Sequence, residues 1–291
     1  ENSRLEGFVR DPSGAIIAGA AVALEAPAIG LKRTSSTDSS GFYAFQNLPG
    51  GQFQLSVEAK GFKKFVKSSI TLDSAANLVL DATLEVGAVT ESVEVTAGLD
   101  QVQLGSTEVS RTLKNEQLTE IPIPGRSLMS LTLLLPGMIS RNGVIEDRGT
   151  STSAGGFFLM GLRKHFNFMT IDGLSNMQNH TMILWSNNIG PDFISEFKVA
   201  TSAYAPEYGR SIGVQMNAVT KSGTRDFHGV FFEFVRNNKL RARSPFEGSV
   251  KPPYRFNDYG WTVGGPVYIP KTWNTDRNKL FFFVGQEFKK V

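Results

Sequence analysis

Apolar and polar residues alternate through much of this 291-residue chain, and this period-two pattern restricts the fold to one built mainly from β-strands. Phe53, Leu55 and Val57, for example, are separated by polar residues. Two turn signals each place Asp at the first position and Gly at the fourth: Asp11-Pro12-Ser13-Gly14 and Asp38-Ser39-Ser40-Gly41. About seven short strands fit into residues 1–86, so we predict a β-sandwich there.

Residues 1–86 resemble the carboxypeptidase regulatory-like (prealbumin-like) domain over almost their whole length. The matching residues are Gly7-Phe8-Val9-Arg10-Asp11, Gly14, Ala20-Ala21-Val22, Thr37-Asp38, Gly41-Phe42-Tyr43, Leu48-Pro49, Gly51, Phe53-Gln54-Leu55 and Ala59-Lys60-Gly61-Phe62. The resemblance implies a non-catalytic sandwich of the kind appended to many exported proteins. It says little about function, because function depends on sites and not on the fold.

Composition limits the classes of function. The chain has 30 Lys and Arg against 27 Asp and Glu, and because these charges are scattered we expect no nucleic-acid partner. It has no Cys, so it uses neither disulfides nor thiolate metal sites. The longest strongly apolar stretch, Ala15 to Leu24, is about half of what a spanning helix requires, so any membrane insertion would use β-strands. Because the chain begins at Glu1 without an apolar leader, we expect any signal peptide to have been removed or left out.

Residues 87–112 are predicted to be a linker that contains one short β-prone run, Glu91 to Ala97. An extended run of this kind can add itself to the exposed edge of another protein's sheet through main-chain hydrogen bonds. Two alternatives are a last strand of the sandwich and a plain linker.

Residues 113–226 predict an α+β unit. Leu128, Leu131 and Leu135 lie on one face of an apolar helix that Pro136-Gly137 ends, and the polar stretch 140–156 predicts a long loop. The remaining expected elements are a strand over 166–173 ending in an Asp-Gly turn, a helix starting near Pro191-Asp192, and strands at Phe197-Lys198-Val199 and over 214–220.

This segment resembles the plug domain of TonB-dependent receptors in five ordered blocks. The blocks are Gly161-Leu162-Arg163, Asp172-Gly173, Ile194-Ser195-Glu196-Phe197-Lys198-Val199, Ala205-Pro206-Glu207-Tyr208-Gly209 and Val219-Thr220-Lys221-Ser222-Gly223. The resemblance implies a plug that blocks a barrel pore, with Arg163, Asp172, Gly173, Tyr208 and Gly209 as motif and gating residues. The run Val93, Glu94, Val95, Thr96 and Ala97 resembles the TonB box, which binds the periplasmic domain of TonB, although Glu94 interrupts its usual apolar character.

Enzyme and metal functions find little support in the sequence. Gly209-Arg210-Ser211-Ile212-Gly213 fits the Gly-x-Ser-x-Gly nucleophile pattern, but a strand pattern follows it and the later His228 is too close for further βα units. His165 and His180 have no carboxylate at ligand spacing on a shared helix face. Asp11 and Asp38 could be read as calcium ligands, but Asp at the first turn position normally binds main-chain amides. We therefore expect no catalytic residue, cofactor or metal.

Three aromatic strands are predicted near the end of the chain, at Gly229–Val235, Gly260–Val267 and Leu280–Phe288. In the first, Val230, Phe232 and Phe234 face one way and Phe231, Glu233 and Val235 the other; in the third, Phe281, Phe283, Gly285 and Glu287 oppose Leu280, Phe282 and Val284. Strands that are apolar on both faces suit a barrel wall between lipid and a packed plug. Arg236-Asn237, Gly264-Gly265-Pro266 and Lys279-Leu280-Phe281-Phe282-Phe283 are similar to the Oar-like branch of the receptor family.

A plugged transporter barrel has about 22 strands of at least about 9 residues, and residues 227–291 are too few to close one. The fold class that we predict is therefore mainly β: a seven-stranded β-sandwich, an α+β plug and the first antiparallel strands of an incomplete outer-membrane β-barrel. We expect this chain to be an N-terminal fragment.

The function implied is that of a TonB-dependent transporter of the cell outer membrane, with the sandwich in the periplasm. Its expected partners are TonB, outer-membrane lipid and a bulky nutrient ligand, without nucleic acid. The alternative is a surface-attached adhesion or carbohydrate-binding β-sandwich protein that does not transport.

Overall fold

The computed structural model describes residues 3–87, 92–94, 108–122, 126, 128–132, 134–136, 138–140, 157–159, 162, 166–176, 189–202, 212–240, 242 and 255–290. The chain divides into two compact units, residues 1–107 with 268–280 and residues 108–267 with 281–291. Helices among the described residues run to six residues at most, and none of them could span a bilayer.

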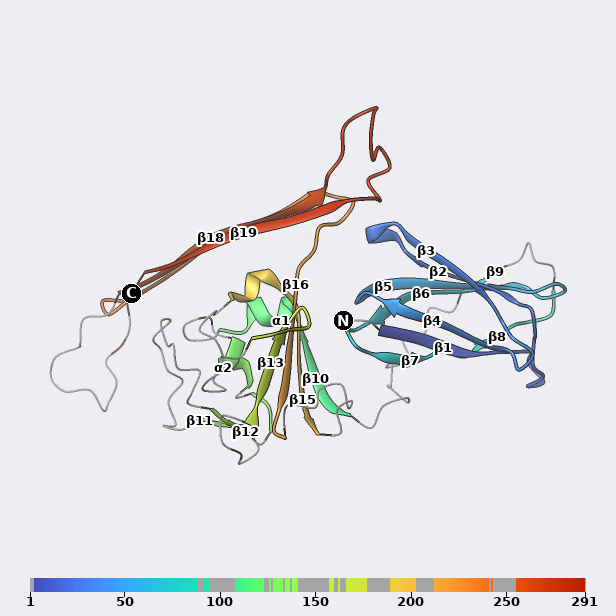
Figure 1. The fold of residues 1–291 in the computed structure, drawn as a ribbon, viewed down its shortest axis with the longest axis horizontal. Helices are drawn as coiled ribbons and strands as arrows, with labels where there is room; N and C mark the ends of the chain where they lie inside the picture. Colours follow the sequence, from blue (N-terminus) through green and yellow to red (C-terminus); the bar gives the residue numbers. More distant parts are fainter. Residues whose placement is uncertain are drawn as a thin grey trace. The chain divides into compact units, whose positions relative to one another are not determined.

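The first unit contains a sandwich of two sheets (Figure 1). One sheet has the order β4-β1-β7, with β8 pairing with the end of β1; its strands are β1 (Ser3–Arg10), β4 (Phe42–Leu48), β7 (Asn77–Val79) and β8 (Ala82–Thr83). The other has the order β3-β2-β5-β6-β9; its strands are β2 (Ala21–Ala26), β3 (Leu31–Ser36), β5 (Gly51–Glu58), β6 (Lys64–Leu72) and β9 (Ser92–Glu94), and the 3-10 turn η1 (Pro27–Ile29) joins β2 to β3. The predicted sandwich is confirmed, with the two-residue β8 and the short β9 added to the seven expected strands.

Alternation along each strand builds the sandwich core. Leu5, Leu24, Leu55 and Ile70 are each at most 1% exposed and belong to one apolar cluster. Tyr43 is buried with them, and its hydroxyl donates to Leu80 O at 2.5 Å, so the polar end of the ring has a partner. The pattern read from the sequence therefore selects the face that each strand buries.

The two predicted turns are closed by their aspartates. Asp11 Oδ1 accepts hydrogen bonds from the Ser13 and Ala15 amides at 2.9 and 2.8 Å. In the second turn, Asp38 Oδ1 accepts from the Ser40 and Phe42 amides at 2.8 and 2.9 Å. The hydrogen bond from the Ser13 hydroxyl lowers the pKa of Asp11, and that from Ser40 lowers the pKa of Asp38. Both aspartates thus act as turn residues.

The second unit is built on a five-stranded sheet of order β10-β15-β16-β13-β14, called the central sheet below. Its strands are β10 (Val109–Lys114), β13 (Phe168–Ile171), β14 (Leu174–Ser175), β15 (Ile194–Ser202) and β16 (Gln215–Thr220), and α1 (Asn115–Glu120), α2 (Leu128–Thr132) and the 3-10 turn η5 (Pro191–Phe193) accompany it. A separate two-stranded pair consists of β11 (Met138–Ser140) and β12 (Phe157–Leu159). Leu128 and Leu131 of α2 are buried in the core of this unit, as predicted, and so is Leu135. The helix ends at Thr132, however, so Leu135 lies beyond it and not on its face as expected.

Two local expectations for this unit differ from the structure. The helix expected near Pro191-Asp192 is the single turn η5, because β15 starts at Ile194 and pairs with strands on both sides. Strand β10 starts at Val109, so the end of the segment read as a linker lies in the central sheet. Pairing with β15 supplies a partner that the local sequence does not reveal.

The three aromatic strands form a separate antiparallel sheet of order β17-β18-β19, called the terminal sheet below (Figure 1). Its strands are β17 (His228–Asn237), β18 (Arg255–Pro266) and β19 (Phe281–Lys290). Phe231 is 77% exposed whereas its neighbour Phe232 is 6% exposed, which confirms the two faces predicted for the first strand. On β18 the buried face includes Phe256, Asp258 and Thr262.

Candidate functional site

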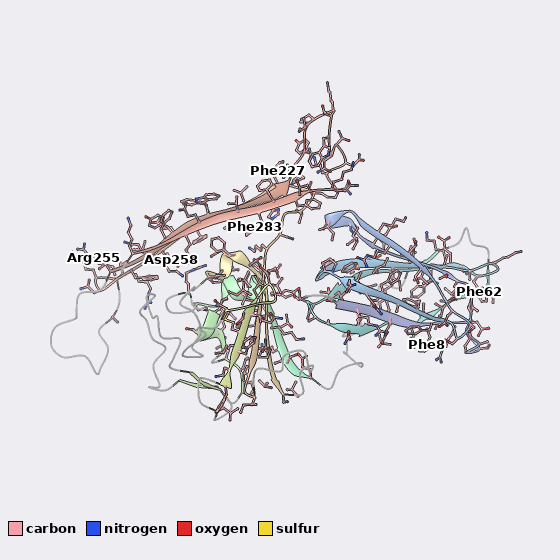
Figure 2. The ribbon with its side chains drawn as sticks, viewed as in Figure 1. Phe8, Phe62, Phe227, Arg255, Asp258 and Phe283 are labelled. Carbon is pink, nitrogen blue, oxygen red and sulfur yellow. The ribbon has the colours of Figure 1, made fainter. Side chains whose placement is uncertain are left out.

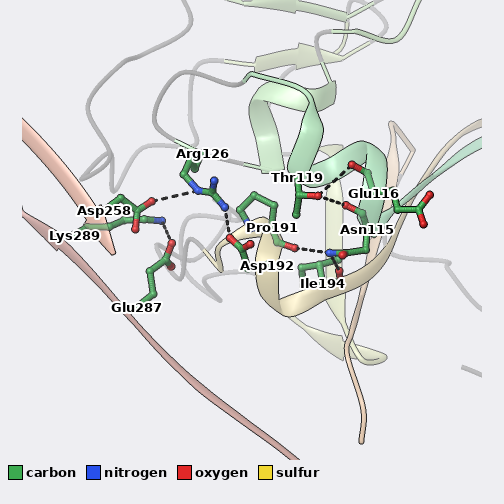
Figure 3. A network of polar contacts seen from close by, with 10 residues as sticks. All are labelled: Asn115, Glu116, Thr119, Arg126, Pro191, Asp192, Ile194, Asp258, Glu287 and Lys289. Carbon is green, nitrogen blue, oxygen red and sulfur yellow. Dashed lines mark hydrogen bonds and ion pairs between the residues drawn. The ribbon is translucent and has the colours of Figure 1, made fainter. Parts of the chain in front are cut away.

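Arg126 lies just before α2 and is the centre of a buried polar cluster in the second unit (Figure 3). Only 7% of the residue is exposed. Its guanidinium carbon lies 3.6 Å from the centroid of the Phe234 ring and 5.4 Å from that of Phe232, both on β17. An arginine held against two aromatic rings away from water is a strong point of contact between elements.

Two carboxylates, one from a turn and one from a strand, meet this arginine. Asp192, in η5, accepts a hydrogen bond from Arg126 Nη2. Asp258, on β18, has its Oδ2 atom 3.5 Å from Arg126 Nε. Asp192 is 5% exposed and Asp258 is fully buried. One side chain therefore connects a turn of the central sheet to a strand of the terminal sheet.

Strand β19 adds a third ion pair to the cluster. Lys289 Nζ lies 3.1 Å from Glu287 Oε1, and both side chains are largely buried. A Cβ atom placed on Gly190, just before η5, would lie 2.5 Å from the same Glu287 oxygen. The absence of a side chain at Gly190 allows this close approach.

Burial and charge oppose each other at Asp192. Burial raises the pKa of Asp192, and the positive charges of Arg126 and Lys221 act against this rise. Burial lowers the pKa of Lys221, which the Asp192 charge opposes. The charges of Asp192 and Lys221 are thus partly desolvated, and each is favoured by partners from other elements.

The turn that carries Asp192 is itself held in place by α1. The Asn115 side-chain amide donates to Pro191 O at 3.1 Å and to Ile194 O at 2.7 Å, so it binds the carbonyls on both sides of the turn. Asn115 directly follows β10. A cavity of about 350 Å³ lies beside this arrangement, lined by α1 residues together with Arg126 and Phe234.

An aromatic contact beside the ionic cluster also requires glycine. A Cβ atom on Gly285 of β19 would lie 2.6 Å from Phe193 Cε1 and 2.6 Å from Trp261 O. The Phe193 ring packs edge-on against Phe232 with centroids 6.5 Å apart. The terminal sheet therefore has a recess opposite η5, formed by the missing side chain.

Several residues predicted to act in TonB binding or gating lie outside the described residues: Val95, Thr96, Ala97, Arg163, Tyr208 and Gly209. Val93 and Glu94 are in β9, paired in parallel with Phe65 and Val66 of β6. The structure thus places two residues of the predicted TonB-binding run in the sheet of the sandwich.

Asp172 and Gly173 form the turn between β13 and β14. Both have left-handed backbones, with φ of 49° and 79°. Asp172 Oδ1 accepts from the Thr220 amide at 2.8 Å, and its Oδ2 accepts from the Thr220 hydroxyl at 2.8 Å. The two hydrogen bonds between Asp172 and Thr220 therefore fix the end of β16. Neither bond involves a residue of the ionic cluster.

Sequence reasoning did not assign Arg126, Asp192, Asp258 or Glu287 to a site. Asp258 carried a usable signal, because it is a charged residue on the buried face of β18. Arg126 carried none, since its partners come from distant parts of the chain. The described residues contain no group of three or more side chains able to hold a metal ion.

Comparisons with known proteins agree with this architecture. A model of the outer membrane beta barrel domain matches residues 219–290, and a model of the carboxypeptidase regulatory-like domain matches residues 4–85. Over 291 aligned residues, the chain is 28% identical to the TonB-dependent transporter Oar of Myxococcus xanthus, covering 95% of this chain and 25% of that protein. The chain is similar to TonB-dependent receptors. These matches place it in the cell outer membrane.

Two solved siderophore receptors resemble parts of this chain. PirA of Acinetobacter baumannii matches with a TM-score of 0.44 and 18% identity, covering 62% of this chain and 24% of that one. PirA of Pseudomonas aeruginosa matches with a TM-score of 0.38 and 16% identity, covering 55% of this chain and 26% of that one. This chain spans about a quarter of the length of the transporter Oar and of each of these two receptors.

Proposed function

We propose that this chain supplies the gate of a TonB-dependent transporter that takes up a bulky nutrient across the outer membrane. In this proposal the central sheet with α1, α2 and η5 is the plug, and the terminal sheet is the first part of the barrel wall. Arg126 holds the plug on the wall until TonB engages residues 93–97 in the periplasm. The observation that carries the proposal is the contact of Arg126 with Asp192 on one side and Asp258 on the other.

The buried charges explain why this contact would act as a gate. Moving the plug, with Arg126, away from β18 would separate Arg126 from Asp258, which is fully buried. Breaking a buried ion pair by removing one partner costs about 3–5 kcal/mol, so the closed arrangement resists small displacements. Water entering the gap would solvate the separated charges, and the plug could then move.

The connectivity gives a route by which force could reach the cluster. The predicted TonB-binding run precedes β10, which pairs with β15 from Val109 to Lys114. At the end of β10, Asn115 binds Pro191 O and Ile194 O, on either side of Asp192. Tension on β10 would therefore load the turn that contacts Arg126.

A permeability assay tests the gate. In the full-length receptor reconstituted into liposomes, Arg126→Ala should raise the leak of a large hydrophilic solute in the absence of TonB. Arg255→Ala is the matched control, because Arg255 is exposed near the same end of β18 as Asp258 (Figure 2). An unchanged leak in the Arg126 variant, with correct insertion shown by protease protection, would refute the clamp.

A binding assay tests the link to TonB separately. The periplasmic C-terminal domain of TonB should retain the chain in a pull-down, and Val95→Pro should abolish retention because proline cannot donate in a strand ladder. Equal retention of both chains, or of neither, would argue against residues 93–97 as the docking run. The alternative function, adhesion or carbohydrate binding by the sandwich, assigns no role to the Arg126 cluster.

A further inference from the structure

Strand β9 is tied into the sandwich by one edge. Its residues pair in parallel with β6, with Ser92 opposite Lys64, Val93 opposite Phe65 and Glu94 opposite Val66. Among the described residues, β9 is the last strand of the sheet β3-β2-β5-β6-β9. One edge of β9 is therefore used in the sandwich, and the other faces outward from the sheet.

The preceding residues bring the chain to this position. The Lys63 amide donates to Glu85 O at 2.8 Å, and the Gly87 amide donates to Gly61 O at 3.1 Å. Phe62 and Val86 form an antiparallel bridge between these bonds. Residues 85–87 thus lie alongside the segment just before β6, and β9 pairs with the first residues of β6 itself.

We infer that the sandwich presents β9 to TonB as an already extended strand, so that a TonB strand adds to the outer edge of β9 while β6 keeps the inner edge. This inference rests on the proposed role of residues 93–97 in TonB binding. It assigns the sandwich a role in the transport cycle, as the template for the docking strand.

The physical advantage is preorganisation. Strand addition gains affinity from main-chain hydrogen bonds, and a disordered segment must be ordered as it binds. Pairing with β6 fixes the backbone of three residues before TonB arrives, so their ordering no longer opposes binding. A strand has two hydrogen-bonding edges, and β6 occupies only one of them.

A disulfide lock distinguishes presentation from release. Lys64→Cys with Ser92→Cys places two cysteines on directly paired residues, and the natural chain has no Cys that could compete. The affinity of the 291-residue chain for the TonB C-terminal domain would be measured in detergent by calorimetry, in the oxidised and reduced forms. Oxidised chain should bind at least as tightly as the same protein after reduction.

Loss of binding on oxidation, with recovery on reduction, would overturn the inference, because it would mean that β9 must leave β6 to meet TonB. The proposed function would survive that result. Val93→Pro separates the two claims: if it binds TonB as well as the natural chain does, or if the natural chain does not bind at all, the docking run itself is wrong.

A second pair of variants tests the template from the side of β9. Ser92 pairs with Lys64 of β6 and lies outside the predicted docking run of residues 93–97. Ser92→Pro changes β9 and leaves the β5–β6 ladder untouched, so it should free β9 from β6, and binding should weaken about tenfold as the cost of ordering returns. Ser92→Gln, which keeps the main-chain amide, is the control and should bind normally.

Hydrogen exchange of the β9 amides that point toward β6 provides the second readout, because successive main-chain amides of a strand point to opposite edges. Exchange of these inner-edge amides should accelerate in the proline variant and stay slow in the glutamine variant. Tighter TonB binding by the proline variant, with accelerated exchange, would contradict presentation, since it would identify β6 as a competitor of TonB.

Discussion

Arg126 Nε lies 3.5 Å from Asp258 Oδ2, which joins the segment before α2 to the second strand of the terminal sheet. Both residues are buried, and Arg126 also binds Asp192 and lies over the Phe234 ring. These contacts make the alignment of the two sheets specific, because a shift of either one would leave a charge in a dry environment without its partner.

Replacing Arg126 should therefore be costly. Arg126→Met keeps much of the apolar stem but removes the ion-pair partner of two buried carboxylates, so the free energy of unfolding should fall by about 3–5 kcal/mol. Urea unfolding of the second unit, followed by tryptophan fluorescence, measures this loss. Arg255→Met, at an exposed position, should change stability by less than about 0.5 kcal/mol.

The triple variant Arg126→Met, Asp192→Asn and Asp258→Asn checks the cause. Removing all three charges should restore part of the stability lost in the single variant, because no uncompensated charge stays buried among them. If the two Asp→Asn changes instead lower the stability of the Arg126→Met variant further, packing and not charge governs this contact.

The pH dependence of stability should carry a contribution from Asp192. Its pKa lies above the ordinary 3.8 because of burial, opposed by Arg126 and Lys221, so the folded chain holds this proton more tightly than the unfolded chain does. The contribution of Asp192 to the free energy of unfolding should then fall as the pH rises from about 3.8, its ordinary pKa, through its raised pKa in the folded chain. Asp192→Asn should remove this slope, as measured by chemical unfolding at a series of pH values.

Removing Arg126 should move that transition. Without its strongest opposing charge, the pKa of Asp192 should rise further, and the fall in stability should occur at higher pH in Arg126→Met than in the natural chain. Carbon-13 NMR of the Asp192 carboxyl would report this directly. An unchanged titration would mean that the two groups are not in contact.

Tyr43 should show a related effect in the sandwich at alkaline pH. Burial, reinforced by the Asp81 charge, raises the pKa of Tyr43 above its ordinary 10.0, so stability should fall as pH rises beyond about 10. Tyr43→Phe should flatten this fall. At neutral pH the same change should cost about 1–2 kcal/mol, because Leu80 O loses its donor. Thermal unfolding at the two pH values separates the two effects.

Local patterning was enough to predict much of the fold. The alternation of Phe53, Leu55 and Val57 gave the buried face of β5, and the aromatic runs gave β17 and its two faces. These features depend on neighbours within a few residues, so the sequence contains the information needed. Asp172-Gly173 was likewise found as a turn, because the left-handed backbone favours these residue types.

The ionic cluster could not be predicted in the same way. Arg126, Asp192 and Asp258 are unremarkable in their local sequences, and they acquire a role only when β18 and η5 meet. The same reason applies to η5, where a helix was expected. Pairing of β15 with β10 and β16 ends the helical turn at Phe193, and that pairing is long-range.

Asp172 should affect stability more than gating. Asp172→Ala removes both acceptors of Thr220 and places a left-handed backbone on a residue that disfavours it, so a loss of about 1–3 kcal/mol is expected. Asp172→Asn should retain most of the stability, because Asn tolerates this backbone and keeps an acceptor. Permeability that rises in the Asn variant without a loss of stability would instead support the predicted gating role.

The recess at Gly285 gives a final test of the contact between the two sheets. A Cβ atom there would lie 2.6 Å from both Phe193 Cε1 and Trp261 O, so Gly285→Ala should push the Phe193 ring away and cost about 1–3 kcal/mol. Phe193→Ala would make room for the new methyl group. The loss of stability in the double variant should therefore be smaller than the sum of the two single losses, by about 0.5 kcal/mol or more. The clash with Trp261 O stays in the double variant, so part of the loss caused by Gly285→Ala should remain. Additive losses in a double-mutant cycle of urea unfolding would mean that η5 does not rest against Gly285 in solution.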